Sequence, residues 1–214
     1  MLARDQVLSK MITILTKTSM RPVLARSAGV SLALAIGAAV VPAHAAQPVV
    51  VAVDGTLCDL TKTLAAGAAS VTCLIPPGGD PHSYRLKPSD RSQIAKSDLV
   101  LHIGFGLTPS AKKLKSPGTV VAVGEVALPS YGGSDPHVWH DPANSAAMVR
   151  VISSSLAPVL PASDRAALQQ RTARAVAVLQ ALQSWEAKQF SSLPPAQRVL
   201  VTDHRTYSHL ADRF

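Results

Sequence analysis

The sequence is poor in cysteine, with only Cys58 and Cys73 among its 214 residues. Their spacing is not that of a Cys-x-x-Cys motif, so it gives no support to a cysteine-ligated zinc site or a dithiol redox centre. In an exported chain, two cysteines lie in a compartment that permits disulfides. We therefore predict a Cys58–Cys73 bridge, and two small buried thiols are the alternative.

Aromatic residues are also scarce, at 4% of the chain, and the 13 acidic residues are outnumbered by 21 basic ones. The resulting net charge of +8 would suit a nucleic acid or an anionic membrane surface. However, five of the basic residues precede position 46, and the others form neither a run of five nor a basic stripe interleaved with aromatics. We predict an ordinary solvated surface and no nucleic-acid partner.

An apolar stretch long enough to span a bilayer is missing. Residues 27–41 are uncharged and rich in Ala, Val and Leu, but such a stretch of about 15 residues is shorter than the roughly 20 that a span needs. Arg21 and Arg26 precede it, and a small-x-small tripeptide ending at Ala45 follows it. We interpret residues 1–45 as a cleaved signal peptide that directs the chain to the periplasm or another extracytoplasmic space. A membrane anchor is the alternative.

From residue 48, short β-rich runs alternate with helical patterns. The predicted strands are 49–53, 71–75, 99–103 and 119–123. Apolar residues at helical spacing follow Leu57, Pro88-Ser89-Asp90 opens a short helix through Ile94, and a Gly/Pro-rich loop runs to Pro142. Strands separated by helices imply a parallel sheet with helices on both faces. We therefore predict an N-terminal α/β lobe over residues 46–142.

The second half is mainly helical. After a helix over 146–156, an apolar stripe runs from about Ser163 to Phe190, and a helix of that length would span about 40 Å. Such a helix could form a spine between two lobes. A strand at Arg198–Thr202 and a helix over 207–214 are predicted next. We divide this half into connecting helices, residues 143–195, and the start of a truncated C-terminal lobe, residues 196–214.

Three histidines are placed where a ligand crevice is expected. The tripeptide Asp-Pro-His occurs twice, from Asp80 to His82 after the second predicted strand and from Asp135 to His137 after the fourth. His204 directly follows the predicted strand of the second lobe. Open α/β sheets form their ligand crevices beyond the carboxyl ends of parallel strands. We predict that the three imidazoles form one metal site.

Each part of this pattern has a chemical reason. Proline fixes the backbone before the imidazole, so less conformational freedom is lost on binding. Asp80 and Asp135 could accept a hydrogen bond from the second ring nitrogen, leaving the other nitrogen for the metal. Imidazole nitrogens suit zinc, copper, iron or nickel, whereas manganese favours carboxylates. The imidazoles by themselves therefore predict one of these four metals, with Mn²⁺ less favoured, and the choice of Zn²⁺ rests on the resemblance described next.

These residues also lie in stretches that resemble a known family, the periplasmic zinc- and manganese-binding proteins of ABC importers. The matching stretches are Leu74–Tyr84, Pro88–Asp90, Ser97–Leu101, Asp135–Trp139, Asp141–Pro142 and Val201–His204. The resemblance implies two α/β lobes joined by a rigid helix, with the metal buried between them and a membrane permease as partner. It also implies that His82, His137 and His204 are ligands, and that histidine at the third position marks the zinc-selective branch. We expect a monomer.

The sequence departs from the family in three ways. The fourth ligand of the family, usually acidic, would lie beyond Phe214. Residues 124–134 contain no histidine, although many zinc-specific members carry a His-rich loop there. His140 and His209 stand where the family usually has apolar or aromatic residues. We treat both as incidental, with assistance in metal capture by His140 as the alternative.

Two other functions compete with metal capture for transport. A zinc hydrolase is the first, because His137, His140 and Asp141 are clustered, but a catalytic zinc needs an open position and a placed general base. The sequence has neither His-Glu-x-x-His nor His-x-His, so we predict a binding protein and no enzyme. A zinc buffer or an adhesin-like surface protein, uncoupled from transport, remains open.

Overall fold

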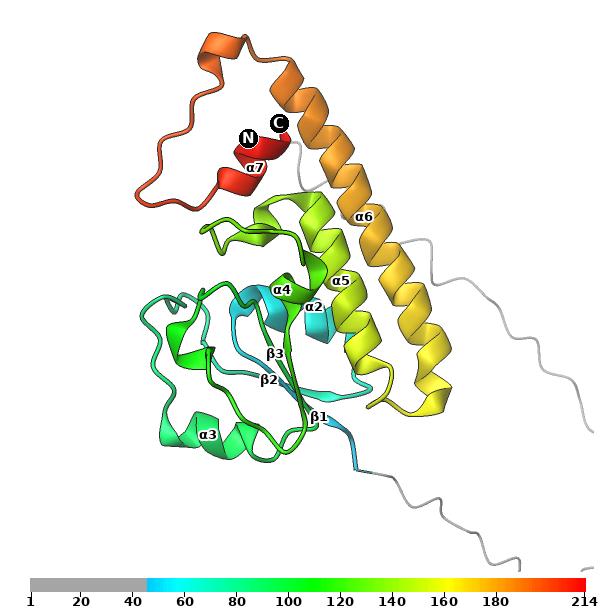
Figure 1. The fold of residues 1–214 in the computed structure, drawn as a ribbon. Helices are drawn as coiled ribbons and strands as arrows, with labels where there is room; N and C mark the ends of the chain where they lie inside the picture. The colour runs from blue at the N-terminus through cyan, green and yellow to red at the C-terminus, as the bar shows by residue number, and fades with distance from the viewer. Residues whose placement is uncertain (1–45) are drawn as a thin grey trace, which may run out of the picture. The chain divides into compact units, whose positions relative to one another are not determined.

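Four short parallel strands form the sheet around which the fold is built (Figure 1). The computed structural model describes residues 46–214, so the predicted signal peptide lies outside the described residues. The strands are β1 (Val49–Ala52), β2 (Ser70–Cys73), β3 (Leu99–His102) and β4 (Thr119–Ala122). They pair in the order β2-β1-β3-β4, and every pair is parallel. The predicted parallel α/β sheet is confirmed, with strand bounds within two residues of those expected.

Helices connect the strands and make up the second half of the described chain. They are α2 (Gly55–Ala65), α3 (Pro88–Ile94), α4 (Val123–Ala127), α5 (Pro142–Leu156), α6 (Arg165–Ser191) and α7 (Ser208–Arg213). Short 3₁₀ turns lie at Pro109–Ala111, Val138–His140, Ala162–Asp164 and Pro195–Gln197. Residues 46–214 belong to one compact unit.

The sheet is buried on both faces, as parallel sheets generally are. Side chains alternate along a strand, so Val50 and Leu99 point into the core shared with α2, α5 and α6. Val51 and Val100 belong to a second, smaller core that includes Ile94 of α3. This double burial explains why the strands read as continuous apolar runs rather than as alternating ones.

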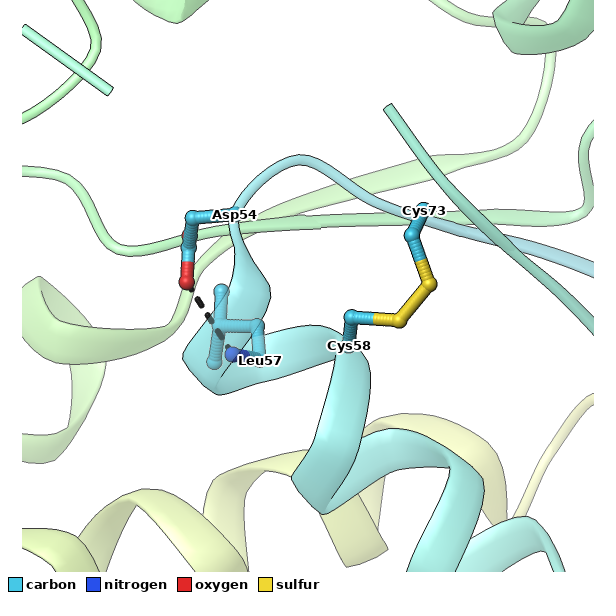
Figure 2. The surroundings of a disulfide bond; sticks show 4 residues. All are labelled: Asp54, Leu57, Cys58 and Cys73. Carbon is cyan, nitrogen blue, oxygen red and sulfur yellow. Dashed lines mark hydrogen bonds between the residues drawn. A yellow bond between two sulfur atoms is a disulfide. The ribbon is translucent and has the colours of Figure 1, made fainter. Parts of the chain in front are cut away.

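The first βα connection holds the two cysteines together (Figure 2). Asp54 ends the first βα turn and caps α2, because its carboxylate accepts a hydrogen bond from the backbone N–H of Leu57 at 3.0 Å. The helix then presents Cys58 to Cys73 at the end of β2, with the two Cα atoms 5.5 Å apart. That separation suits a disulfide, and the structure joins the two sulfur atoms. The oxidation state in solution stays a prediction.

Two antiparallel helices lie side by side along one side of the sheet (Figure 1). Helix α5 starts at Pro142, four residues earlier than predicted, because Asp141 accepts the N–H of Ala143 and caps it. The long helix α6 has 27 residues, as the apolar stripe predicted. Its C-terminal half is less buried, and Trp185 is 59% exposed. None of the helices that the structure describes is long and apolar enough to cross a membrane.

Two local predictions were wrong. Residues 124–142 are not a plain loop, since α4 and a 3₁₀ turn lie within them. Residues 198–202 do not form a strand. A β-branched run forms a strand only where a neighbouring strand pairs with it through hydrogen bonds. None of the described strands lies beside residues 198–202. Val199 and Val201 are accordingly 76% and 88% exposed.

Candidate metal centre

The three predicted ligands meet in one cluster. One nitrogen from each of His82, His137 and His204 can be chosen so that all three lie within 4.8 Å of one another. The Nε2 atoms of His82 and His137 are 2.9 Å apart, and the ring of His204 is 5.1 Å from that of His137 and 5.4 Å from that of His82, measured between centroids. The loops after β2 and α4 and the segment before α7 therefore bring together residues that are up to 122 positions apart.

The ring of His137 is oriented by the aspartate of its own tripeptide. Asp135 Oδ1 accepts hydrogen bonds from the backbone N–H of His137 at 3.0 Å and from its ring Nδ1 at 2.7 Å. Burial by itself would raise the pKa of Asp135, but the hydrogen bonds from His137 and Ser208 outweigh it and lower the pKa. The carboxylate therefore stays ionised and keeps the proton on Nδ1. The lone pair of His137 is left on Nε2, facing the cluster.

The other tripeptide works differently from the prediction. Asp80 accepts the backbone N–H of His82 at 2.9 Å and the hydroxyl of Ser83 at 2.7 Å. The Ser83 hydrogen bond first, and then the His82 backbone, lower the pKa of this exposed carboxyl. In the described chain, Asp80 accepts no hydrogen bond from the ring of His82. An aspartate that closes a turn on the backbone two residues later shapes the loop and leaves the imidazole free.

A third aspartate, which the sequence reasoning missed, holds His204. Asp203 Oδ1 accepts from the ring Nδ1 of His204 at 2.9 Å, and this hydrogen bond is the main reason that the pKa of Asp203 is lowered. Thr206 Oγ1 lies 2.9 Å from the other ring nitrogen, Nε2. The signal was available in the sequence, because a carboxylate directly precedes the histidine. It was overlooked because it lacks the proline of the other two motifs.

The remaining histidines near the cluster differ in their surroundings. His140 packs on Tyr207, with ring centroids 4.3 Å apart, and burial lowers its pKa. Its ring is 6.4 Å from that of His137, and it is not part of the cluster. His209 is buried and lies 3.0 Å from the backbone oxygen of Asp135. Neither ring belongs to the cluster, so the treatment of both histidines as incidental to metal binding stays a prediction.

The cluster has the chemistry of a metal site. Zinc–nitrogen bonds of about 2.0–2.1 Å in a tetrahedron separate the nitrogens by about 3.3 Å, close to the separation of the Nε2 atoms of His82 and His137. Two imidazole lone pairs at this distance repel each other unless a proton or a cation lies between them. Imidazole nitrogen is a donor that zinc, copper, iron and nickel bind well, so the cluster offers a cation three suitable donor atoms. The fold and this cluster define a metal-binding α/β protein.

Comparisons with known proteins identify its family. The family described as zinc-uptake complex component A, periplasmic (ZnuA), matches residues 50–214, and the chain belongs to it. The zinc-binding protein TroA of Treponema pallidum is 31% identical over 77% of this chain and 56% of its own length. The manganese-binding lipoprotein MntA of Halalkalibacterium halodurans is 31% identical over 73% of this chain and 54% of its own length.

A further relative is named for iron binding, and a solved structure of the family matches the fold. The iron-binding protein YfeA of Yersinia pestis is 30% identical over 72% of this chain and 52% of its own length. The solved structure of periplasmic TroA matches with a TM-score of 0.73 and 29% identity, covering 78% of this chain and 64% of that one. The chain thus spans about half the length of the curated relatives that it matches.

Proposed function

We propose that this chain captures Zn²⁺ through His82, His137 and His204, outside the cytoplasm, and delivers it to the membrane permease of an ABC importer. The observation that carries the proposal is the convergence of three imidazole nitrogens within 4.8 Å. The names of its relatives support a metal as the cargo and leave the ion open, because they specify zinc, manganese and iron.

The donor set favours zinc over manganese. Zinc is well matched to imidazole nitrogen, whereas manganese is better matched to carboxylate oxygen. In the described chain, the cluster is composed of imidazoles alone. Asp135 and Asp203 accept hydrogen bonds from the Nδ1 atoms of His137 and His204, as the partners of metal-bound histidines commonly do.

Transport and location form the second part of the proposal. The description of the family as periplasmic supports capture outside the cytoplasm, which is also what the signal peptide predicted for residues 1–45 would lead to. We propose that the chain works as a monomer that docks on a permease. A zinc buffer without a permease differs in one respect, since it would hold the ion and pass it to no membrane partner.

A competition experiment tests the metal site. Zinc affinity of the purified chain would be measured against a chelator of known affinity, for His82→Ala, His137→Ala and His204→Ala. His102→Ala is the matched control, because His102 ends β3 and lies outside the cluster. Removal of a hydrogen-bond partner of a metal ligand typically weakens metal binding by roughly 10- to 100-fold. Each variant that removes a ligand itself should lose more affinity than that, while the control should keep its affinity. Equal losses at all four positions would show nonspecific binding to histidine and overturn the proposal.

Metal preference and pH dependence supply two further readouts. Zinc should displace manganese from the site at equal free concentration. Binding requires neutral imidazoles, so affinity should fall as the pH drops through about 6.5, the ordinary range of histidine. Tighter binding of manganese than of zinc would contradict the assignment of the cargo. Transport is tested separately, by zinc-dependent binding of the chain to membranes that contain a candidate ABC permease, with membranes that lack it as the control.

A further inference from the structure

The short helix α7 is fastened to the loop of the second ligand. The backbone N–H of Ser208, its first residue, donates to Asp135 Oδ2 at 3.1 Å. The ring Nε2 of His209 donates to the backbone oxygen of Asp135 at 3.0 Å. Farther along, the guanidinium of Arg213 pairs with Asp141, at 2.8 Å from Nε and 2.6 Å from the terminal nitrogen. Both residues that receive α7 flank His137 in the sequence.

These contacts matter because little else described holds this segment. A helix of six residues is too short to be stable alone. The preceding residues, 192–206, are almost all exposed, and His204 lies among them. Apart from α7, two kinds of contact join this segment to distant parts of the described chain. Arg205 donates to the hydroxyl oxygen of Ser134 at 3.2 Å, and the ring of His204 packs against those of His82 and His137. The position of His204 therefore depends on where α7 is docked.

His209 is the buried residue of α7. It is 7% exposed, and its ring lies 4.7 Å from that of Tyr131, measured between centroids. Asn144 Nδ2 approaches the ring Nδ1 at 3.4 Å, which favours the tautomer that carries its proton on Nε2. His209 therefore donates from Nε2 to the backbone oxygen of Asp135. The side chain of that same Asp135 holds the ring of His137, so one residue links the second and third ligands.

We propose that His209 is a positioning residue for metal capture, which docks α7 on Asp135 and thereby holds His204 beside His82 and His137. This inference rests on the proposed function. It assigns His209 no contact with the metal. Its effect on affinity should be exerted through His204, and a residue that merely stabilised the fold would not show that dependence.

A double-mutant cycle separates the two roles. Zinc affinity would be measured by chelator competition for His209→Leu, His204→Ala and the double variant, in the full chain. The Leu variant should lose roughly 10- to 100-fold in affinity, as when a partner that orients a ligand is removed. In the His204→Ala background, the same substitution should cost less than about threefold, because the ligand that it positions is already gone.

Two matched variants sharpen the test. His209→Gln keeps an N–H donor and should recover most of the affinity. His102→Leu removes a partly buried imidazole at the end of β3, outside the cluster, and its affinity should stay within about threefold of the parent. If circular dichroism shows that His209→Leu does not fold, the cycle is run with Arg213→Gln, which removes the ion pair between α7 and Asp141.

The outcomes distinguish this inference from the proposed function. An unchanged affinity of His209→Leu, or an equal loss with and without His204, overturns the positioning role. In both of those cases, a strong dependence on His82 and His137 would leave the zinc site itself intact. If the parent chain binds zinc no better than His82→Ala does, the proposed function fails first and takes the inference with it.

Discussion

The buried hydrogen bond between Asp135 and His137 offers a sharp test of how the site is built. We consider Asp135→Asn, with Asp203→Asn as its matched control. Both aspartates accept a hydrogen bond from the Nδ1 of a predicted ligand, at 2.7 Å and 2.9 Å respectively. They differ in exposure, since the side chain of Asp135 is 1% exposed and that of Asp203 is 91% exposed.

The difference in exposure sets the expected magnitudes. A hydrogen bond to a charged group contributes about 1.5–3 kcal/mol where water is excluded, which corresponds to roughly 10- to 150-fold in zinc affinity. Asp135→Asn should therefore bind zinc about 10- to 100-fold more weakly. Water replaces the carboxylate easily at an exposed site, and exposed ion pairs contribute about 0–1 kcal/mol. Asp203→Asn should therefore lose at most about fivefold.

Chelator competition at about pH 7.5 measures both variants, and a titration with Co²⁺ reports on the geometry of the site. In Asp135→Asn the amide can no longer accept at both oxygens, so the contact with Ser208 is also weakened. The Co²⁺ spectrum of this variant should change, whereas that of Asp203→Asn should resemble the parent. Equal losses in the two variants would refute the reasoning, because burial would then have no influence on how strongly an aspartate orients its imidazole.

The remaining predictions concern stability. Burial raises the pKa of Asp54 from 3.8 to about 6. The resulting contribution of Asp54 to the free energy of unfolding is fully present below about pH 4 and is lost as the pH rises through about 6. Asp54→Asn, which can still cap α2, should therefore gain up to about 3 kcal/mol on the parent between about pH 4 and pH 8 in urea unfolding. A constant difference would contradict the buried ionisation. Reduction of the Cys58–Cys73 bridge, whose cysteines are 15 residues apart, should lower the free energy of unfolding by roughly 3 kcal/mol. Two free thiols in the denatured, unreduced chain would exclude the bridge.

Much of the sheet could be predicted from the sequence because it depends on local pattern. Each strand is a continuous apolar run, which is what burial on both faces requires. Pro88 and Asp90 marked the start of α3 at the correct residue. Where a pattern needed a distant partner, prediction was wrong. Residues 198–202 have the composition of a strand, but a strand exists only by pairing, and composition does not supply the neighbour.

The sequence was enough to single out the three histidines of the cluster. His82 and His137 follow β2 and β4 along the chain, and the carboxyl ends of parallel strands meet at one edge of a sheet. His204 was placed beside them through a strand that the structure does not form, so its position in the cluster was decided by tertiary structure. What each aspartate does was decided by tertiary structure. Asp80 and Asp135 stand in the same tripeptide, yet one closes a turn on the backbone and the other orients a ring. His209 gives the same lesson, since nothing in its local sequence indicates that it donates to a residue 74 positions away. The reason is physical: residue type and spacing fix which chemical groups are available, whereas burial and long-range contacts decide which of their hydrogen bonds are formed.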